Sequence, residues 1–202
     1  MSATAAQSSR NNSTRTRILE AALEILSRDG PAKASMAEIA RRAGLSRQGM
    51  YLHFSSKDEL TYAAARHAFE VQHANAQEML ASRRPFTERL VGALMAEYAS
   101  LYSGTRSRAA RFWQGYEAPV IDRIIEMRNR FDRSFVELLA GALESDGAVI
   151  GPDDPHARSF VDLATVLVAA ARGLTLSTRE ISTKDRAELL RIAVTRLCAP
   201  SR

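Results

Sequence analysis

Between Ser35 and Phe54 the sequence signals two short helices separated by a tight turn, which limits the possible folds more than any other stretch. The segment reads SMAEIARRAGLSRQGMYLHF. Ser35 with Glu38 three residues later is a capping box, in which two side chains satisfy free amides of the first helical turn. Gly44 ends that helix after about two turns, and Ser46 can cap another helix almost at once. Two short helices around a glycine-containing turn predict a helix-turn-helix.

The second of these helices has two faces of opposite character. Met50 and Phe54, four residues apart, fall on one face and are expected to point into the core. Arg47, Gln48 and Tyr51 share the opposite face, because they are separated by steps of three and four residues. Guanidinium, amide and phenol groups on one exposed face are suited to contacting the bases and backbone of DNA. The segment therefore predicts a DNA-recognition helix.

The rest of the chain is also predicted to be helical, because no stretch alternates apolar and polar residues with the β-branched enrichment of a strand. Residues 1–13 are expected to be a disordered tail. A first helix is expected over 14–28, since Asp29-Gly30-Pro31 stops it with a C-terminal glycine and a proline. Further helices are expected at about 56–82, 85–103, 107–115, 119–146, 160–176 and 183–197.

The composition is that of an ordinary soluble globular protein, and the cytoplasm is the expected compartment. The 202 residues are 46% hydrophobic and 25% charged, which is enough apolar material for a proper core. Cys198 is the only cysteine, so an internal disulfide is impossible and a reducing compartment is expected. No apolar run approaches the roughly 18 residues of a membrane span, and the first residues lack the apolar region of a secretory signal.

The positive charge is concentrated in the N-terminal quarter. The chain carries a net charge of +5, and residues 1–57 contain nine Lys or Arg against four Asp or Glu. The remaining residues contain 19 of each sign and contribute no net charge. This excess favours a polyanionic partner at the N-terminal domain, although a solvated basic surface is an equally good reading of charge alone.

The stretch SMAEIARRAGLSRQGMYLHFSSKDEL resembles the DNA-binding segment of the TetR family of transcriptional regulators. The resemblance covers about residues 14–62 without a gap. It implies an all-α fold, with a three-helix DNA-binding domain at 14–60 and a helical ligand-binding and dimerisation domain at 61–202. The residues that match the family pattern in order and spacing are Ser35, Ile39-Ala40, Ala43-Gly44, Tyr51, Phe54 and Lys57.

The candidate DNA contacts divide into base readers and backbone contacts. Gln48 is suited to an adenine edge, and Arg47 to guanine or to a phosphate. Gly49 would let the backbone approach closely, or is simply tolerated there. Tyr51, His53 and Lys57 are assigned to phosphates. Helix N-termini bind phosphates well, so the capping residues Ser35 and Ser46 are also candidate phosphate contacts. The sequence leaves open whether Arg10, Arg15 and Arg17 reach DNA as a basic arm.

The resemblance also implies a ligand pocket and a homodimer in the C-terminal part. An apolar or aromatic effector is expected, but helically spaced aromatic residues are also typical of plain core. The candidate dimer stripes double as candidate core for the same reason. The candidate pocket residues are Met95, Tyr98, Tyr102, Phe112, Trp113, Tyr116, Met127, Phe131 and Phe135, with Gln114 and Arg130 as polar candidates. The candidate dimer stripes are Ala164, Leu167, Val168, Ala171, Leu174 and Thr175, and Leu189, Ile192, Ala193, Arg196 and Leu197.

The function that this implies is a repressor released from a palindromic DNA operator by a small molecule. A transcriptional activator of the same fold and a helical interaction module that binds no DNA are the alternatives. Enzymatic activity is not expected, because no nucleophile elbow, phosphate loop, dinucleotide loop or zinc-protease motif occurs. His67 and His73, six residues apart, point about 240° apart on a helix and make a poor metal pair. We therefore expect no metal and no cofactor.

Overall fold

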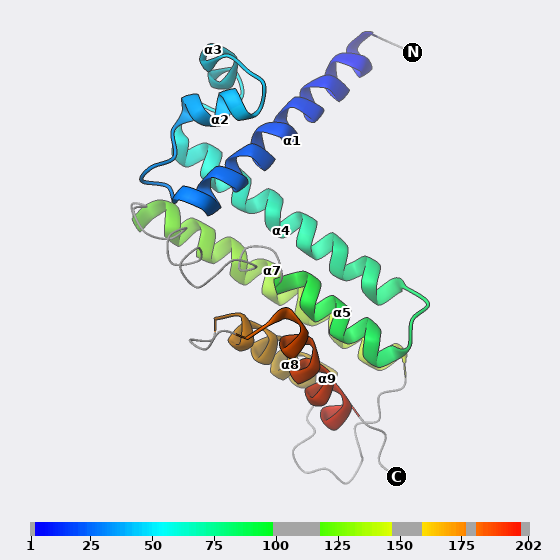
Figure 1. Ribbon diagram of the computed structural model, residues 1–202. Helices are drawn as coiled ribbons and strands as arrows, with labels where there is room; N and C mark the ends of the chain where they lie inside the picture. Colours follow the sequence, from blue (N-terminus) through cyan, green and yellow to red (C-terminus); the bar gives the residue numbers. More distant parts are fainter. Residues whose placement is uncertain (1–2, 99–117, 147–158, 177–180, 199–202) are drawn as a thin grey trace. The chain divides into compact units, whose positions relative to one another are not determined.

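The computed structural model describes residues 3–98, 118–146, 159–176 and 181–198 (Figure 1). Helices are the regular elements throughout these ranges, and no strand occurs within them, which confirms the predicted all-α class. The predicted helix over 107–115 lies outside the described residues. The helices are α1 (Ala3–Asp29), α2 (Met36–Arg42), α3 (Arg47–Tyr51), α4 (Lys57–Ala81), α5 (Phe86–Tyr98), α7 (Ala118–Ser145), α8 (Phe160–Leu176) and α9 (Thr183–Leu197).

The chain forms two compact units, Met1–Ala68 with Gly104–Glu126 and Phe69–Ser103 with Met127–Arg202. The division falls within α4 and α7, so each of these helices contributes residues to both units. The sequence predicted a boundary at residue 60, close to the start of α4. Among the described residues, no helix is both long and apolar enough to cross a lipid bilayer.

The first unit buries one apolar cluster that draws on α1, α2, α3 and the first turns of α4. α1 supplies an apolar stripe that includes Ile18, Ala22 and Ile25, each at most 1% exposed. Gly30 ends α1 at a φ of 77°, and Gly44 follows α2 at a φ of 71°. This left-handed backbone favours glycine, so both turns form where the sequence predicted them.

The N-terminal end of α1 differs from the prediction. The helix begins at Ala3 and includes most of the segment 1–13 that the sequence predicted as a disordered tail. Ala3, Ala5 and Ala6 have the highest helix propensity of any residue type, and no glycine or proline interrupts the chain before Gly30. The segment therefore extends the amphipathic helix that follows it.

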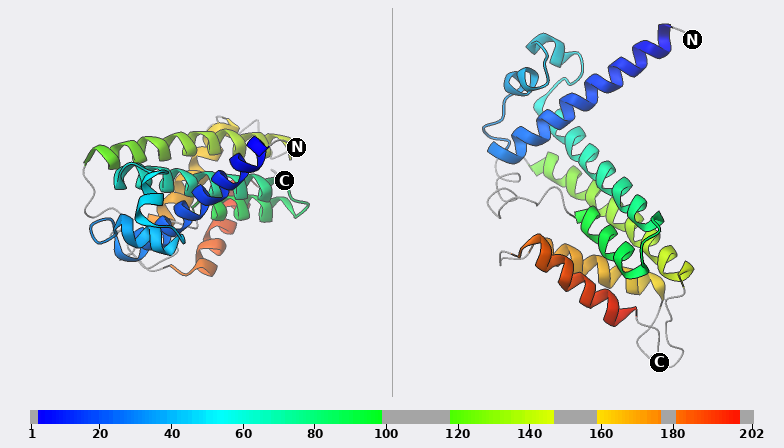
Figure 2. Two further views of the ribbon diagram at one scale, coloured as in Figure 1. Left: turned by 90° about the horizontal axis from the view of Figure 1, so that it is seen from above. Right: turned by 45° about the vertical axis from the view of Figure 1, so that its right-hand side comes forward.

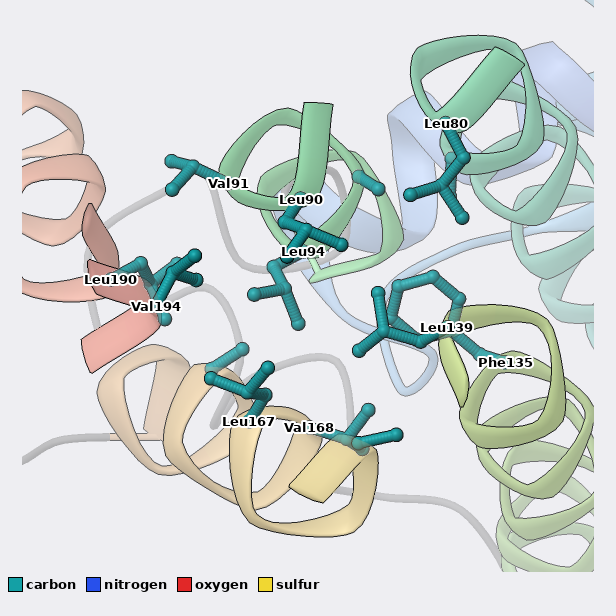
Figure 3. Close-up of a cluster of buried hydrophobic side chains, with 14 of the residues drawn as sticks. Leu80, Leu90, Val91, Leu94, Phe135, Leu139, Leu167, Val168, Leu190 and Val194 are labelled. Carbon is teal, nitrogen blue, oxygen red and sulfur yellow. The ribbon is translucent and has the colours of Figure 1, made fainter. Parts of the chain in front are cut away.

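The second unit has its own core, formed by α5, α8 and α9 with residues of α4 and α7. α8 and α9 pack against each other, and α5 packs against both, as the views in Figure 2 show. Leu90 and Leu94 of α5 point into the centre of this cluster (Figure 3). Leu139 of α7 and Leu167 of α8 meet them there.

Candidate nucleic-acid interface

Ser46 caps the N-terminus of α3, as the sequence predicted. Its backbone is extended, and its Oγ accepts a hydrogen bond from the Gly49 amide at 3.0 Å. A Cβ at Gly49 would lie 3.3 Å from that Oγ. Glycine therefore also relieves crowding against the cap, which is an intramolecular reason for its presence besides close approach to DNA.

The two faces of α3 are separated as the spacing predicted. Met50 and Phe54 are 0% and 1% exposed, and both lie in the core of the first unit. Arg47, Gln48 and Tyr51 are exposed. Because the buried pair anchors the helix from below, the three polar side chains are available to a partner molecule.

The helix is shorter than expected, and its end presents an apolar residue that the sequence analysis missed. α3 finishes at Tyr51 with Leu52 as its C-terminal cap, whereas the prediction extended it to about Phe54. Leu52 is 84% exposed and lies directly beside Tyr51 in the chain. The sequence pattern that could have identified Leu52 is an apolar residue on the polar face of an amphipathic helix.

Ser35 caps α2, but the capping box is only half formed. Its Oγ accepts from the Glu38 amide at 3.1 Å. The Glu38 carboxylate accepts from Arg28 of α1 at 2.8 Å. Glu38 therefore ties α2 to α1, and a phosphate contact by Ser35 stays a prediction.

Lys57 and His53, both predicted to contact phosphates, also have roles within the protein. The Lys57 Nζ donates to the carbonyl oxygen of Pro31 at 2.8 Å, which links the start of α4 to the loop after α1. The His53 carbonyl oxygen accepts from Arg15 Nη1 at 3.2 Å. The Lys57 ammonium has two further donors and the His53 ring is half-exposed, so their phosphate contacts stay predictions.

Comparison with known proteins assigns this helix-turn-helix to a family. Residues 18–64 match the profile of the bacterial regulatory proteins of the tetR family. The regulator SrpR of Pseudomonas putida is 44% identical over 50 residues, which are 25% of this chain and 24% of SrpR. The uncharacterised regulator YvdT of Bacillus subtilis is 45% identical over 49 residues, 24% of this chain and 25% of YvdT. The matched segment thus spans about a quarter of the length of both relatives.

Solved structures resemble the fold of the whole chain. A putative TetR-family regulator from Rhodococcus sp. aligns with a TM-score of 0.64 at 21% identity, over 92% of this chain and 98% of its own. A putative regulator from Saccharomonospora viridis in complex with choline gives 0.64 at 20%, over 91% and 96%. These identities show the fold alone. Residues 18–64 therefore carry the helix-turn-helix of the tetR family of bacterial regulatory proteins.

The candidate pocket residues within the described ranges are mostly core residues. Tyr98 is buried in the cluster of the second unit, and Met95 packs against it. Met127 is buried, and Phe131 is half-buried with its ring centroid 5.8 Å from that of Phe69. Five further candidates lie outside the described residues, namely Tyr102, Phe112, Trp113, Gln114 and Tyr116. A pocket lined by these side chains stays a prediction.

Part of the predicted dimer surface faces inward instead. Leu167 and Ala171 are 0% and 1% exposed in the core of their own protomer, so neither is available to a second copy. They lie on the face of α8 that packs against α5 and α9, and helical spacing alone cannot tell this face from an outer one. Leu174 and Ala193 are half-buried against the same core. Leu189 and Leu197 are exposed, as are Val161, Val166 and Ile192.

The second unit also contains a buried ionic network that the sequence analysis did not find. Arg128 of α7 donates to Glu97 Oε1 of α5 at 2.7 Å and to Asp132 Oδ1 at 2.6 and 2.8 Å. Its guanidinium carbon lies 4.9 Å from the ring centroid of Phe69 and 5.0 Å from that of Tyr98. The Arg128 guanidinium therefore contacts two aromatic rings and two carboxylates.

Further polar contacts join this network to α4 and α8. His73 Nδ1 of α4 lies 3.3 Å from Glu97 Oε2, and Arg172 Nη1 of α8 donates to Asp132 Oδ2 at 3.0 Å. The Tyr98 hydroxyl donates to Asp132 Oδ1 at 2.9 Å. Glu97 is fully buried, and this burial raises its pKa. Four helices of the second unit thus meet at two carboxylates.

Proposed function

We propose that this protein is a DNA-binding transcriptional regulator in which α3 reads the major groove. The observation that carries the proposal is the division of α3 into a fully buried anchor and an exposed polar face. Gln48 has the amide pair that recognises adenine, and Arg47 has the fork that recognises guanine or a phosphate. The concentration of positive charge in residues 1–57 supports the same partner.

Replacing Gln48 by alanine is expected to relax base preference at one position of each half-site. The discrimination lost there should be about 1–3 kcal/mol, because one bidentate base contact disappears. Competition binding against operators with single-base changes measures it. Gln77→Ala, which removes an exposed glutamine of α4, is the matched control and should leave the preference unchanged. If Gln48→Ala weakened all sequences alike, the side chain would be a backbone contact.

The regulator is proposed to act as a homodimer. Val161 and Val166 on α8 and Leu189, Ile192 and Leu197 on α9 are each 43–52% exposed, although the two helices pack together. A symmetric four-helix contact between two copies would bury these side chains and stabilise the pair. A two-fold protein reads a palindromic site, with half-site centres about 34–36 Å apart or a multiple of that distance.

Ile192→Asp is expected to convert the dimer to a monomer, because the substitution would place an unpaired carboxylate in an apolar contact. Light scattering after size-exclusion chromatography measures the mass. Ile125→Asp is the matched control, because Ile125 of α7 is 47% exposed and Ile192 is 52% exposed. A dimer that persists in Ile192→Asp but dissociates in Ile125→Asp would place the interface elsewhere.

The regulator is further proposed to be a repressor that a small molecule releases from DNA. The support is the fold shared with a solved structure that holds choline, and the buried network that joins α4 to three other helices of the second unit. α4 begins directly after the helix-turn-helix and continues into the second unit, so a shift of α4 would reach both. A ligand that binds the second unit and lowers operator affinity supports release. Recruitment of polymerase by the DNA-bound protein would favour the activator.

A further inference from the structure

The turn that follows α3 is held by an arginine of α1. Arg15 Nη1 donates to the His53 carbonyl oxygen at 3.2 Å, across 38 residues of sequence. Its guanidinium carbon lies 4.2 Å from the centroid of the Phe54 ring. The hydrogen bond fixes the main chain at His53, and the stacking fixes the buried ring that anchors α3.

The same turn is held from the side of α4. Both the amide and the hydroxyl of Ser55 donate to Glu59 Oε2, at 2.8 and 2.7 Å. These bonds lower the pKa of Glu59, and the positive charge of Arg15 lowers it further. Arg15 of α1 thus holds the turn at His53 and Phe54, and Glu59 of α4 holds it at Ser55.

These contacts to the turn after α3 matter because α3 is too short to be stable or oriented by itself. Arg47–Tyr51 is five residues long, and helices far longer than this are marginal without tertiary contacts. The Ser46 cap secures its first turn, and Leu52 at its other end is 84% exposed. The direction in which α3 presents Gln48 and Tyr51 thus depends on how the following turn is held.

We propose that Arg15 is a positioning residue for DNA reading, which holds the end of α3 at the angle that its exposed face requires, and is not itself a DNA contact. This inference rests on the proposed DNA-binding function. It distinguishes Arg15 from a phosphate-binding basic arm, because the Arg15 guanidinium contacts His53 and Phe54 of its own chain.

The test is the ratio between operator affinity and affinity for unrelated DNA of equal length. Arg15→Met keeps the apolar stem and removes the charge and the donors. It should weaken operator binding about tenfold, because a hydrogen bond and a stacked cation are lost, and leave non-specific binding unchanged. The salt dependence of operator binding should also be unchanged, since the number of phosphates neutralised is the same. Arg15→Lys should restore little, because lysine lacks the planar fork with which one guanidinium both stacks on the Phe54 ring and donates to the His53 carbonyl oxygen.

Three results would overturn the inference. A direct phosphate contact would weaken both DNAs in parallel, reduce the salt slope by about 0.9, and be rescued by lysine. A role in stability alone would lower the melting temperature and leave the affinity ratio of the folded protein intact. If Arg15 had neither role, Arg15→Met would change neither the melting temperature nor the affinity ratio. Arg17→Met, which removes an exposed arginine two residues away, is the matched control and should keep the ratio. Failure of the wild-type chain to bind any DNA would refute the proposed function instead.

Discussion

Replacing Phe54 by alanine is expected to destabilise the first unit by about 3–5 kcal/mol and to abolish operator binding, because a fully buried ring is lost. Phe54 is 1% exposed and belongs to the apolar cluster formed by α1 to α4. The substitution also removes the ring on which Arg15 stacks. A loss of this size is a large fraction of the total stability of a typical domain. Urea unfolding followed by circular dichroism measures it, alongside an operator-binding titration.

The adjacent surface of the same turn provides the control. Leu52 is 84% exposed, so Leu52→Ala should change the free energy of unfolding by no more than about 0.5 kcal/mol. A similar cost for both substitutions, or wild-type stability in Phe54→Ala, would show that α3 is not anchored as the structure has it.

Replacing Arg128 by methionine is expected to lower the free energy of unfolding by about 3–5 kcal/mol near neutral pH. The methionine side chain has a volume similar to that of the apolar part of arginine. The main loss is therefore the positive charge that compensates the carboxylates of Glu97 and Asp132. The Glu97 side chain is 0% exposed, and water cannot replace the missing partner. Arg191→Met is the control, since its partner Glu188 is exposed and such surface pairs contribute at most about 1 kcal/mol.

The pH dependence of this loss has a definite sign. Burial raises the pKa of Glu97 in the folded protein, whereas Arg128 opposes that rise through its charge and its hydrogen bond. Without Arg128 the folded pKa rises further above the unfolded value of about 4.3. A group with a raised folded pKa stabilises fully below its unfolded pKa, and this contribution is lost as the pH rises through the folded value. The deficit of Arg128→Met relative to wild type should therefore grow as the pH rises above the unfolded pKa of about 4.3, and a deficit that does not change with pH would mean that Glu97 does not titrate.

The sequence predicted those features that local chemistry determines. Ser46 caps α3 and Gly44 occupies a left-handed turn because short-range hydrogen bonds and backbone sterics leave few alternatives. The burial of Met50 and Phe54 follows from helical periodicity. These local rules were sufficient to locate the helix-turn-helix and its exposed face.

Features that depend on distant contacts were not predictable in the same way. Arg128 and Asp132 are an i,i+4 pair, which resembles an ordinary surface pair until Glu97 is brought in from 31 residues away. Leu167 lies on a helical stripe that suits a dimer surface and a core equally, and only the packing of α8 against α5 and α9 distinguishes them. Lys57 donates to a carbonyl 26 residues earlier, which no local pattern indicates.

Selection of bound duplexes from a random DNA pool is the most direct measurement of what α3 recognises. We expect enrichment of one palindrome, whose half-site centres lie about 34–36 Å apart or a multiple of that distance. This enrichment should be lost when Arg47, Gln48 and Tyr51 are all replaced by alanine. A pool that stays random with the wild-type protein, or an enrichment that survives the triple substitution, would contradict this expectation.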